Sequence, residues 1–377
     1  MELNKRKLLF VVNVDWFFIS HRLPLAEEAM RRGDEVYLIT KDTGRMAELK
    51  YAGLQCFEID FERSGKNPIK ELKLISKLAS LYKIIQPDLI HHITLKPSIY
   101  GTLAAKICHS SARIINTVSG LGYTFTAGRR SVSKYILTFL LKLAFSDKKA
   151  NFIFQNPDDL AVYKRFGFLN ELNNIIIKGA GVDENIFYYR EPHSKDTDKI
   201  RVVLLARMLK DKGVLEFIKA GNVLKEILQD RMEFVLVGGI DEFNPAAISA
   251  DTLYKLCDNV FISWLGQRAD VMEIYDKADI VCLPSYREGL PKSLVEAMAI
   301  GRPLITTDAI GCRECVEEGV NGFLTPIGDH IILAERIKTL VLDKKLRLKM
   351  GEASRMKMVK EMSLNNVVKM TFSFYEK

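Results

Sequence analysis

Short apolar runs alternate with longer stretches of helical spacing along almost the whole chain. The runs span about four to eight residues and are rich in branched side chains, which is typical of buried strands. Between most of them lie amphipathic stretches such as residues 68–86 and 98–109. A strand followed by a helix, many times over, predicts parallel sheets covered by helices on both faces. The runs predicted as strands are residues 7–14, 35–40, 88–93, 113–119, 151–156, 173–179, 201–207, 233–239, 260–266, 279–285, 303–308 and 322–327.

The alternation is interrupted by a polar stretch with a proline at residues 186–200, which is typical of a linker. The chain of 377 residues is also about twice the usual domain length. We therefore predict an α/β protein of two doubly wound, Rossmann-like domains, residues 1–185 and 186–377, that face each other across a cleft. Ligands of open α/β sheets bind beyond the carboxyl ends of the strands, so this cleft is the expected site. The tail after about residue 328 is expected to be helical, and its last helix is a candidate to return to the first domain.

Composition and charge are those of a soluble globular protein with acidic partners. Hydrophobic residues make up 48% and charged residues 27% of the chain. A net charge of +8 favours nucleic acid, an anionic lipid surface or phosphorylated substrates, without choosing among them. The first residues are expected to form a strand rather than a signal peptide, and no apolar run is long enough to predict a spanning helix. The most apolar stretch, residues 135–145, predicts either a buried helix or a helix lying on a membrane surface.

Metal-binding patterns are weak. Cys312 and Cys315 form a CxxC, but no second pair and no nearby histidine completes a zinc set. We expect two free thiols in a reducing cytoplasm. The DxD at residues 196–198 lies between lysines in the predicted linker and is interpreted as a solvated turn. Neither a metal nor another cofactor is expected.

The first candidate site is the strand, loop and helix of residues 284–301, PSYREGLPKSLVEAMAIG. Pro291 suits the first helical position, where its missing N–H costs nothing. A helix N-terminus presents unpaired N–H groups and a positive dipole end, which suits a phosphate. Gly289 permits close approach of a ligand to the loop backbone, and Lys292 and Ser293 offer further donors.

Two glutamates with seven residues between them, Glu288 and Glu296, flank this helix start. A carboxylate accepts hydrogen bonds from neighbouring hydroxyls, so it suits a sugar or a ribose better than a phosphate. Together with a diphosphate at the helix start, the pair outlines a nucleotide-sugar. The alternatives stay open at this point: a surface pair of Glu296 with Lys292, and a solvated loop charge at Glu288.

Two cations, Arg207 and Lys212, follow the first strand of the second predicted domain, just before Gly213. Cations at the carboxyl end of a strand can neutralise a diphosphate and stabilise it as a leaving group. Surface lysines are common, so a solvated surface charge is the alternative for this pattern.

These segments together resemble the retaining glycosyltransferases of family 4, and Glu288 and Glu296 match the E-x7-E motif of that family. The resemblance implies a two-domain glycosyltransferase-B fold. It further implies that Arg207 and Lys212 hold the donor diphosphate, that Glu296 holds the ribose and that Glu288 faces the transferred sugar. The donor-binding set that the resemblance implies is Glu296, Gly289, Leu290, Lys292, Ser293 and Gly238. The matching segments are residues 179–187, 206–213, 234–239, 286–308 and 319–324.

The first half is similar to members of the family that extend lipid-linked sugars for surface polysaccharides such as capsule or O-antigen. The segments concerned are residues 19–24, 87–106 and 116–125. The candidates on the acceptor side are His21, Arg22, Lys96, Gly120, Gly122 and Tyr123. A simple turn is the alternative for the last three, and a lipid diphosphate headgroup is the hypothetical partner of Arg22 and Lys96.

Two departures from the family concern catalysis. The glycine-rich loop after the first strand is replaced by NVDWFFISHR, and the His-x-His of the fourth strand is replaced by His91, His92 and Ile93. A catalytic histidine therefore cannot be carried over directly. His92 is the candidate, His21 is the alternative, and a histidine at a strand end is more often structural.

The sequence thus predicts a cytoplasmic, retaining hexosyl- or N-acetylhexosaminyltransferase that uses a nucleotide-sugar, expected to be UDP-linked. The predicted acceptor is a polyprenyl-diphosphate-linked saccharide, with the enzyme peripheral on the inner face of the cell membrane. In the family's front-face substitution the leaving diphosphate accepts a hydrogen bond from the incoming hydroxyl, so no protein nucleophile is required. A nucleotide-sugar epimerase and a non-catalytic nucleotide-sugar or polysaccharide binding protein are the rivals. The chain lacks a P-loop and a G-x-G-x-x-G, and nothing in it favours nucleic acid.

Overall fold

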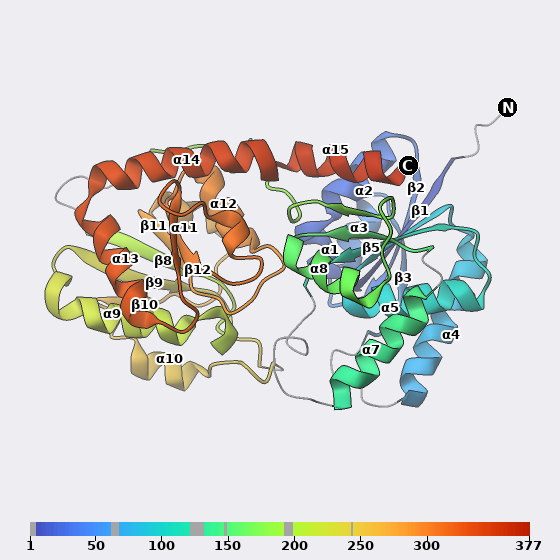
Figure 1. Cartoon of the computed structure of the whole chain (residues 1–377), viewed down its shortest axis with the longest axis horizontal. Helices are drawn as coiled ribbons and strands as arrows, with labels where there is room; N and C mark the ends of the chain where they lie inside the picture. Colours follow the sequence, from blue (N-terminus) through green and yellow to red (C-terminus); the bar gives the residue numbers. More distant parts are fainter. Residues whose placement is uncertain (1–4, 62–67, 121–131, 147–148, 192–198, 243) are drawn as a thin grey trace. The chain divides into compact units, whose positions relative to one another are not determined.

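The computed structural model describes residues 5–61, 68–120, 132–146, 149–191, 199–242 and 244–377. The chain divides into two compact units. Unit 1 comprises Met1–Ala180 with Val367–Lys377, and unit 2 comprises Gly181–Asn366. Each unit is built on its own parallel sheet (Figure 1).

Unit 1 contains a seven-stranded parallel sheet in the order β3-β2-β1-β4-β5-β6-β7. Its strands are β1 (Lys7–Val14), β2 (Glu35–Lys41), β3 (Gln55–Glu58), β4 (Leu89–Ile93), β5 (Arg113–Val118), β6 (Asn151–Phe154) and β7 (Asn174–Ile176). Its helices are α1 (Asp15–His21), α2 (Leu23–Arg31), α3 (Met46–Tyr51), α4 (Pro68–Ile85), α5 (Leu95–Ile107), α7 (Val132–Phe145), α8 (Pro157–Phe166) and most of α15 (Leu364–Tyr375).

The two faces of this sheet pack against different helices, as the alternation along β1 shows. Leu9 and Val11 belong to the core that also holds residues of α4, α5, α7 and α8. Leu8 and Phe10, on the opposite face, belong to the core shared with α1, α2 and α15 (Figure 1). Successive side chains of a strand point to opposite faces, so a strand covered on both sides must be apolar throughout. This accounts for the unbroken apolar run that opens the chain.

Unit 2 contains a six-stranded parallel sheet in the order β10-β9-β8-β11-β12-β13. Its strands are β8 (Ile200–Leu205), β9 (Met232–Val237), β10 (Ile262–Trp264), β11 (Ile280–Leu283), β12 (Leu304–Thr307) and β13 (Gly322–Thr325). Its helices are α9 (Val214–Leu228), α10 (Ala250–Leu256), α11 (Val271–Asp276), α12 (Lys292–Ile300), α13 (His330–Leu342) and α14 (Lys344–Met362), with short 3-10 turns at η1 (Lys210–Lys212) and η2 (Arg313–Cys315).

Every run predicted as a strand contains one, and the expected doubly wound α/β architecture of each half is confirmed. Strand β3 was not predicted, because QCFE at an edge of the sheet is short and lacks an apolar pattern. Helix α5 begins at Leu95, earlier than expected, since Pro97 is tolerated within the first turn of a helix. The DxD of residues 196–198 lies outside the described residues.

The sequence of helix α7 left open whether the helix is buried or lies at a surface, and the structure shows that one side is buried and the other is exposed. Leu141, Ala144 and Phe145 are fully buried in the core, whereas Tyr135 and Phe139 are about two-thirds exposed. Among the described residues, no helix is long and apolar enough to cross a membrane.

Each sheet has one point at which the order of strands reverses, between β1 and β4 in unit 1 and between β8 and β11 in unit 2. The helices that follow the two strands diverge there, which opens a crevice outside the carboxyl ends of the strands. Ligands of doubly wound sheets bind at such points. The two reversals therefore mark where a site is expected in each unit.

Candidate functional site

The reversal in the sheet of unit 2 carries an ion pair. Lys212 ends the turn η1 that follows β8, and its Nζ contacts Glu288 Oε1 in the loop after β11. Ser285 Oγ donates to the same carboxylate oxygen at 2.8 Å. Both charged side chains are largely buried, at 18% and 13% exposure, so solvent screens the pair poorly. An anion that binds Lys212 must compete with Glu288.

Glycines let the two loops that carry this pair approach each other closely. Gly213 has φ +72°, and a Cβ there would lie 2.0 Å from the carbonyl oxygen of Pro284. Gly311 has φ +78°, and a Cβ there would lie 2.4 Å from the carbonyl oxygen of Glu288. No larger residue fits either position without moving the loops. The backbone contacts, rather than the charges alone, therefore fix where Lys212 and Glu288 meet.

Arg207 lies at the same edge of the sheet, directly after β8. Its Nη1 contacts Asp241 Oδ2 at 2.5 Å, and its side chain is 46% exposed. The neighbouring loop passes so close that a Cβ at Gly238 would lie 1.7 Å from the carbonyl oxygen of Ala206. Arg207 and Gly238 are thus brought together by the adjacent strands β8 and β9.

Glu296 lies in helix α12 and is 91% buried, since only 9% of it is exposed. Its Oε2 accepts a hydrogen bond from Tyr275 OH at 3.1 Å, and Lys292 Nζ lies 3.5 Å from its Oε1. Burial raises the pKa of Glu296 above its ordinary value, and Lys292 and Tyr275 partly offset this effect. The surface pair with Lys292 is therefore present, but the carboxylate itself is not a surface charge.

The start of α12 differs slightly from the expectation. The helix begins at Lys292, so Pro291 is the N-cap residue rather than the first helical residue, and no described side chain caps it. Ser293 contributes its carbonyl oxygen, which accepts from Tyr275 OH at 2.8 Å, and Leu290 packs against the core of unit 2. The carbonyl oxygen of Gly289 lies beside Gly311.

In unit 1, His92 is completely buried in the core. Its Nε2 lies 2.9 Å from Tyr82 OH and its Nδ1 lies 2.9 Å from Asn116 Oδ1. A Cβ at Gly101 would lie 2.2 Å from His92 Nε2, so the ring fills the space above a glycine. Burial lowers the pKa of His92 to about 4, which keeps the ring neutral at physiological pH. This arrangement is typical of a structural histidine.

The other acceptor-side candidates are spread over the unit. His21 stacks on Phe17, with ring centroids 4.1 Å apart, and Nδ1 lies 2.6 Å from Ser20 Oγ. Arg22 is buried, donates to the carbonyl oxygen of Gly179 at 3.4 Å, and has a pKa lowered to about 10 by burial. Gly122 and Tyr123 lie outside the described residues.

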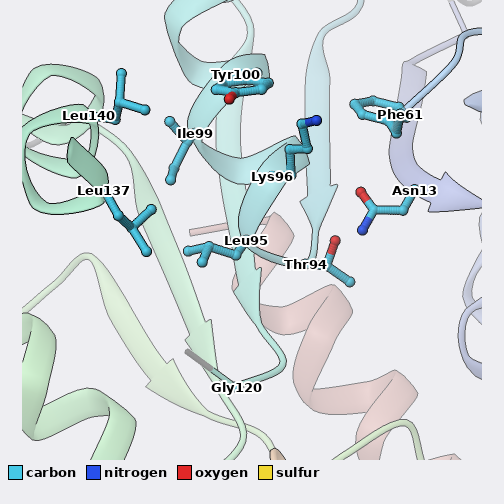
Figure 2. Close-up of a pocket in the computed structure, with 10 residues that line it drawn as sticks. All are labelled: Asn13, Phe61, Thr94, Leu95, Lys96, Ile99, Tyr100, Gly120, Leu137 and Leu140. Atoms are coloured by element: carbon cyan, nitrogen blue, oxygen red, sulfur yellow. The ribbon is translucent and has the colours of Figure 1, made fainter. Parts of the chain in front are cut away.

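Lys96 and Gly120 line one pocket of unit 1, shown in Figure 2. Lys96 Nζ lies 2.9 Å from Glu71 Oε1, so its charge is already compensated. Asn13 and Thr94 belong to the same pocket, at the reversal between β1 and β4, and were not expected as site residues.

Several contacts of the site could not be read from local sequence. Tyr275, Ser285 and Asp241 each hold a predicted residue in place, but no motif marks them. Ser285 and Asp241 share one signal, which is their position after buried strands of unit 2, whereas Tyr275 lies in α11 and has no such signal. All six cysteines are free, and Cys312 and Cys315 are fully buried. Among the described residues, no group of three or more His, Cys, Asp or Glu side chains could hold a metal ion.

Comparisons with known proteins agree with the geometry of both units. Residues 186–357 match the family model of glycosyl transferases group 1, and residues 7–156 match the model described as glycosyl transferase 4-like. The chain is 32% identical over 355 residues to the N,N'-diacetylbacillosaminyl-diphospho-undecaprenol alpha-1,3-N-acetylgalactosaminyltransferase of Campylobacter jejuni, covering 89% of this chain and 91% of the relative.

Two further comparisons bear on partners and on the fold. The UDP-Gal:alpha-D-GlcNAc-diphosphoundecaprenol alpha-1,3-galactosyltransferase of Escherichia coli is 24% identical, with 86% of this chain and 84% of the relative covered. The crystal structure of Anabaena Alr3699/HepE in complex with UDP and glucose superposes with a TM-score of 0.76 at 19% identity, covering 99% of this chain and all of the other. The likeness at this identity concerns the fold, and it agrees with the predicted glycosyltransferase-B fold.

Proposed function

Because the chain belongs to the glycosyl transferases group 1 family and is a glycosyltransferase, we propose that it transfers a sugar from a UDP-sugar to a polyprenyl-diphosphate-linked saccharide, with retention at the anomeric carbon. The observation that carries the proposal is the ion pair of Lys212 and Glu288 at the strand reversal of unit 2, with the buried Glu296 in the helix that follows. The names of the Campylobacter jejuni and Escherichia coli relatives support a lipid-diphosphate acceptor in surface polysaccharide or glycan assembly.

Donor binding is proposed to exchange one ion pair for another. The diphosphate takes Lys212 from Glu288. It also adds Arg207, whose side chain is about half-exposed and whose guanidinium keeps further N–H groups besides the Nη1 that contacts Asp241. Glu288 is then released to accept hydrogen bonds from hydroxyls of the transferred sugar. Glu296, held by Tyr275, accepts from the ribose hydroxyls. Glu288 and Glu296 thereby each find donors that match them.

The proposed chemistry is a front-face substitution. The bond from the anomeric carbon to the diphosphate oxygen breaks, and the acceptor oxygen bonds to the same face of that carbon. The proton of the acceptor hydroxyl passes to the leaving diphosphate oxygen, so no protein base is needed. Lys212 and Arg207 stabilise the charge that develops on the diphosphate. This stabilisation is the main contribution of the protein to catalysis.

We place the proposed enzyme on the inner face of the cell membrane through helix α7. Tyr135, Ile136, Phe139 and Leu143 form an exposed apolar stripe, at 49–65% exposure, on the side of α7 away from the core. Lys142 is exposed beside it, and the net charge of +8 suits an anionic leaflet. An apolar stripe on the exposed side of a helix, with a cation beside it, is typical of a helix that lies in a membrane surface.

Transfer by the purified protein tests the proposal. UDP-, GDP- and ADP-sugars are offered with polyprenyl-diphosphate-linked saccharides, and mass spectrometry follows the acceptor. We expect a gain of one sugar with a UDP-sugar, which Glu296→Ala abolishes. The control is Glu273→Ala, which removes an exposed glutamate that, like Glu296, lies near a lysine one helical turn away, Lys277 at 3.8 Å. A new UDP-sugar isomer without acceptor would instead indicate an epimerase, and UDP binding without turnover would indicate a binding protein.

A further inference from the structure

The pocket at the strand reversal of unit 1 has a volume of about 310 Å³. It lies at the carboxyl ends of the strands, because Asn13 is the last residue but one of β1 and Thr94 follows β4. Its size is at the lower end of the range of about 300–1,000 Å³ that is usual for small-molecule sites. The pocket is therefore large enough for one sugar unit and its substituents, but not for a long oligosaccharide.

The pocket carries little net charge. Its cation, Lys96, is paired with Glu71, at 2.9 Å and with both side chains at 21% exposure or less. A phosphate in the pocket would have to displace Glu71 from Lys96 and leave that carboxylate poorly solvated. The ligand that the pocket suits is consequently neutral.

One side of the pocket has polar atoms without partners. Asn13 Oδ1, Thr94 Oγ1 and Ser119 Oγ, which is adjacent to the lining residue Gly120, are buried and have no hydrogen-bond partner in the described part of the chain. Figure 2 shows the amide of Asn13 and the hydroxyl of Thr94 pointing into the pocket. Buried polar atoms are almost always paired, so unpaired ones indicate a ligand that pairs them. Thr94 also has φ +74°, a strained backbone for a β-branched residue and a frequent mark of a ligand site.

The opposite side is apolar. Leu95 and Ile99 of α5 face Leu137 and Leu140 of α7 across it (Figure 2). An unsubstituted sugar ring would press hydroxyls against these branched side chains and leave the hydroxyls unpaired. A ligand that fits must present an apolar group to α5 and α7 and an amide or hydroxyl to Asn13 and Thr94.

We propose that this pocket binds an acetamido group of the acceptor sugar and so makes the enzyme selective for N-acetylated acceptors. The methyl of the acetamido group lies against Leu137 and Leu140, and its N–H and C=O pair with Asn13 and Thr94. The inference rests on the proposed function, since it names a feature of the acceptor. It agrees with the diacetylated acceptor sugar in the name of the Campylobacter jejuni relative.

Binding to the intact protein tests the inference without requiring turnover. Saturation-transfer NMR compares methyl 2-acetamido-2-deoxyglucoside with methyl glucoside. We expect the acetamido methyl protons to be the most strongly saturated, and methyl glucoside to bind at least about tenfold more weakly, as one buried methyl group is worth about 10–200-fold. Equal binding of the two sugars would overturn the inference.

Two variants assign the effect to the pocket. Thr94→Val is isosteric and removes an unpaired buried hydroxyl, so the protein should fold at least as well while binding of the acetamido sugar falls about tenfold. Leu137→Asn removes the apolar wall and should have the same effect. The control is Leu172→Asn, which changes a highly exposed leucine of unit 1 outside the pocket. Unchanged affinity in folded Thr94→Val would contradict the assignment.

A transfer assay separates this inference from the proposed function. Polyprenyl-diphosphate acceptors are prepared with an N-acetylhexosamine or with the matching hexose at the reducing end. Preference for the N-acetylated acceptor, reduced by Thr94→Val with donor affinity unchanged, supports the inference. Equal use of both acceptors would overturn it and leave the glycosyltransferase function intact. If neither acceptor gains a sugar, the proposed function fails and the NMR experiment alone decides the inference. Chemical-shift changes at Leu137 caused by a sugar-free polyprenyl diphosphate, and not by the acetamido sugar, would assign the pocket to the lipid chain instead.

Discussion

The ion pair of Lys212 and Glu288 allows a quantitative prediction about stability and rate together. Lys212→Met keeps the length of the side chain and removes its charge, which leaves Glu288 with the hydrogen bond from Ser285 but without its cation. Removing one partner of a buried pair costs about 3–5 kcal/mol. Because the two side chains are 18% and 13% exposed rather than fully buried, we expect the free energy of unfolding of unit 2 to fall by about 2 kcal/mol. If Lys212 also stabilises the leaving diphosphate, kcat should fall by about 10²–10³-fold.

Urea unfolding followed by Trp264 fluorescence measures the stability of unit 2, in a Trp16→Phe background that removes the other tryptophan of the chain. The matched control is Lys225→Met, which breaks an ion pair with Asp258 in the same unit, at 42% and 34% exposure. Exposed pairs contribute about 0–1 kcal/mol, so this variant should change little. Combining Lys212→Met with Glu288→Gln should recover part of the lost stability, because the uncompensated charge is then removed as well. Additivity of the two single variants within about 0.5 kcal/mol would refute a coupled pair.

Three further predictions follow from single residues. Burial raises the pKa of Glu296, so affinity for UDP should fall as pH drops through a value above the ordinary glutamate range. Calorimetry should find this pH dependence absent in Glu296→Gln, and its persistence there would exclude Glu296 as the titrating group. Gly213→Ala should destabilise unit 2 in urea unfolding by about 1–2 kcal/mol for the left-handed backbone, and by a further amount for the clash with Pro284. Gly266→Ala, with φ +68° and open space around it, should show the backbone cost alone. The pKa of His92 is lowered to about 4, so below the ordinary histidine pKa the unfolded state binds more protons than the native state. Unit 1 should therefore lose stability as pH falls from about 6.5 to 4, and less steeply in His92→Gln. An unchanged slope in that variant would assign the loss to other groups.

Local pattern determined most of the fold because secondary structure depends on neighbours in sequence. Apolar runs bounded by turn residues predicted the strands, and stretches of helical spacing predicted helices such as α4, which begins at Pro68 as expected. The exception, β3, shows the limit. Its pairing with β2 decides that it is a strand, and an edge strand need not carry an apolar pattern.

The site shows the same limit: the sequence identified its main residues, but not the contacts between them. The sequence by itself singled out Glu288, Glu296, Arg207 and Lys212, since these residues lie in motifs next to strand ends. It did not show that Lys212 meets Glu288, 76 residues away, or that Tyr275 holds Glu296. Those contacts depend on the order of strands in the sheet and on how closely Gly213 and Gly311 let the loops approach. Neither can be predicted from the periodicity of apolar residues within one segment. The pocket of unit 1 belongs wholly to this second class. Asn13 and Thr94 come together only because β1 and β4 are neighbours in the sheet, and their unpaired atoms are a property of three-dimensional packing that no stretch of sequence displays.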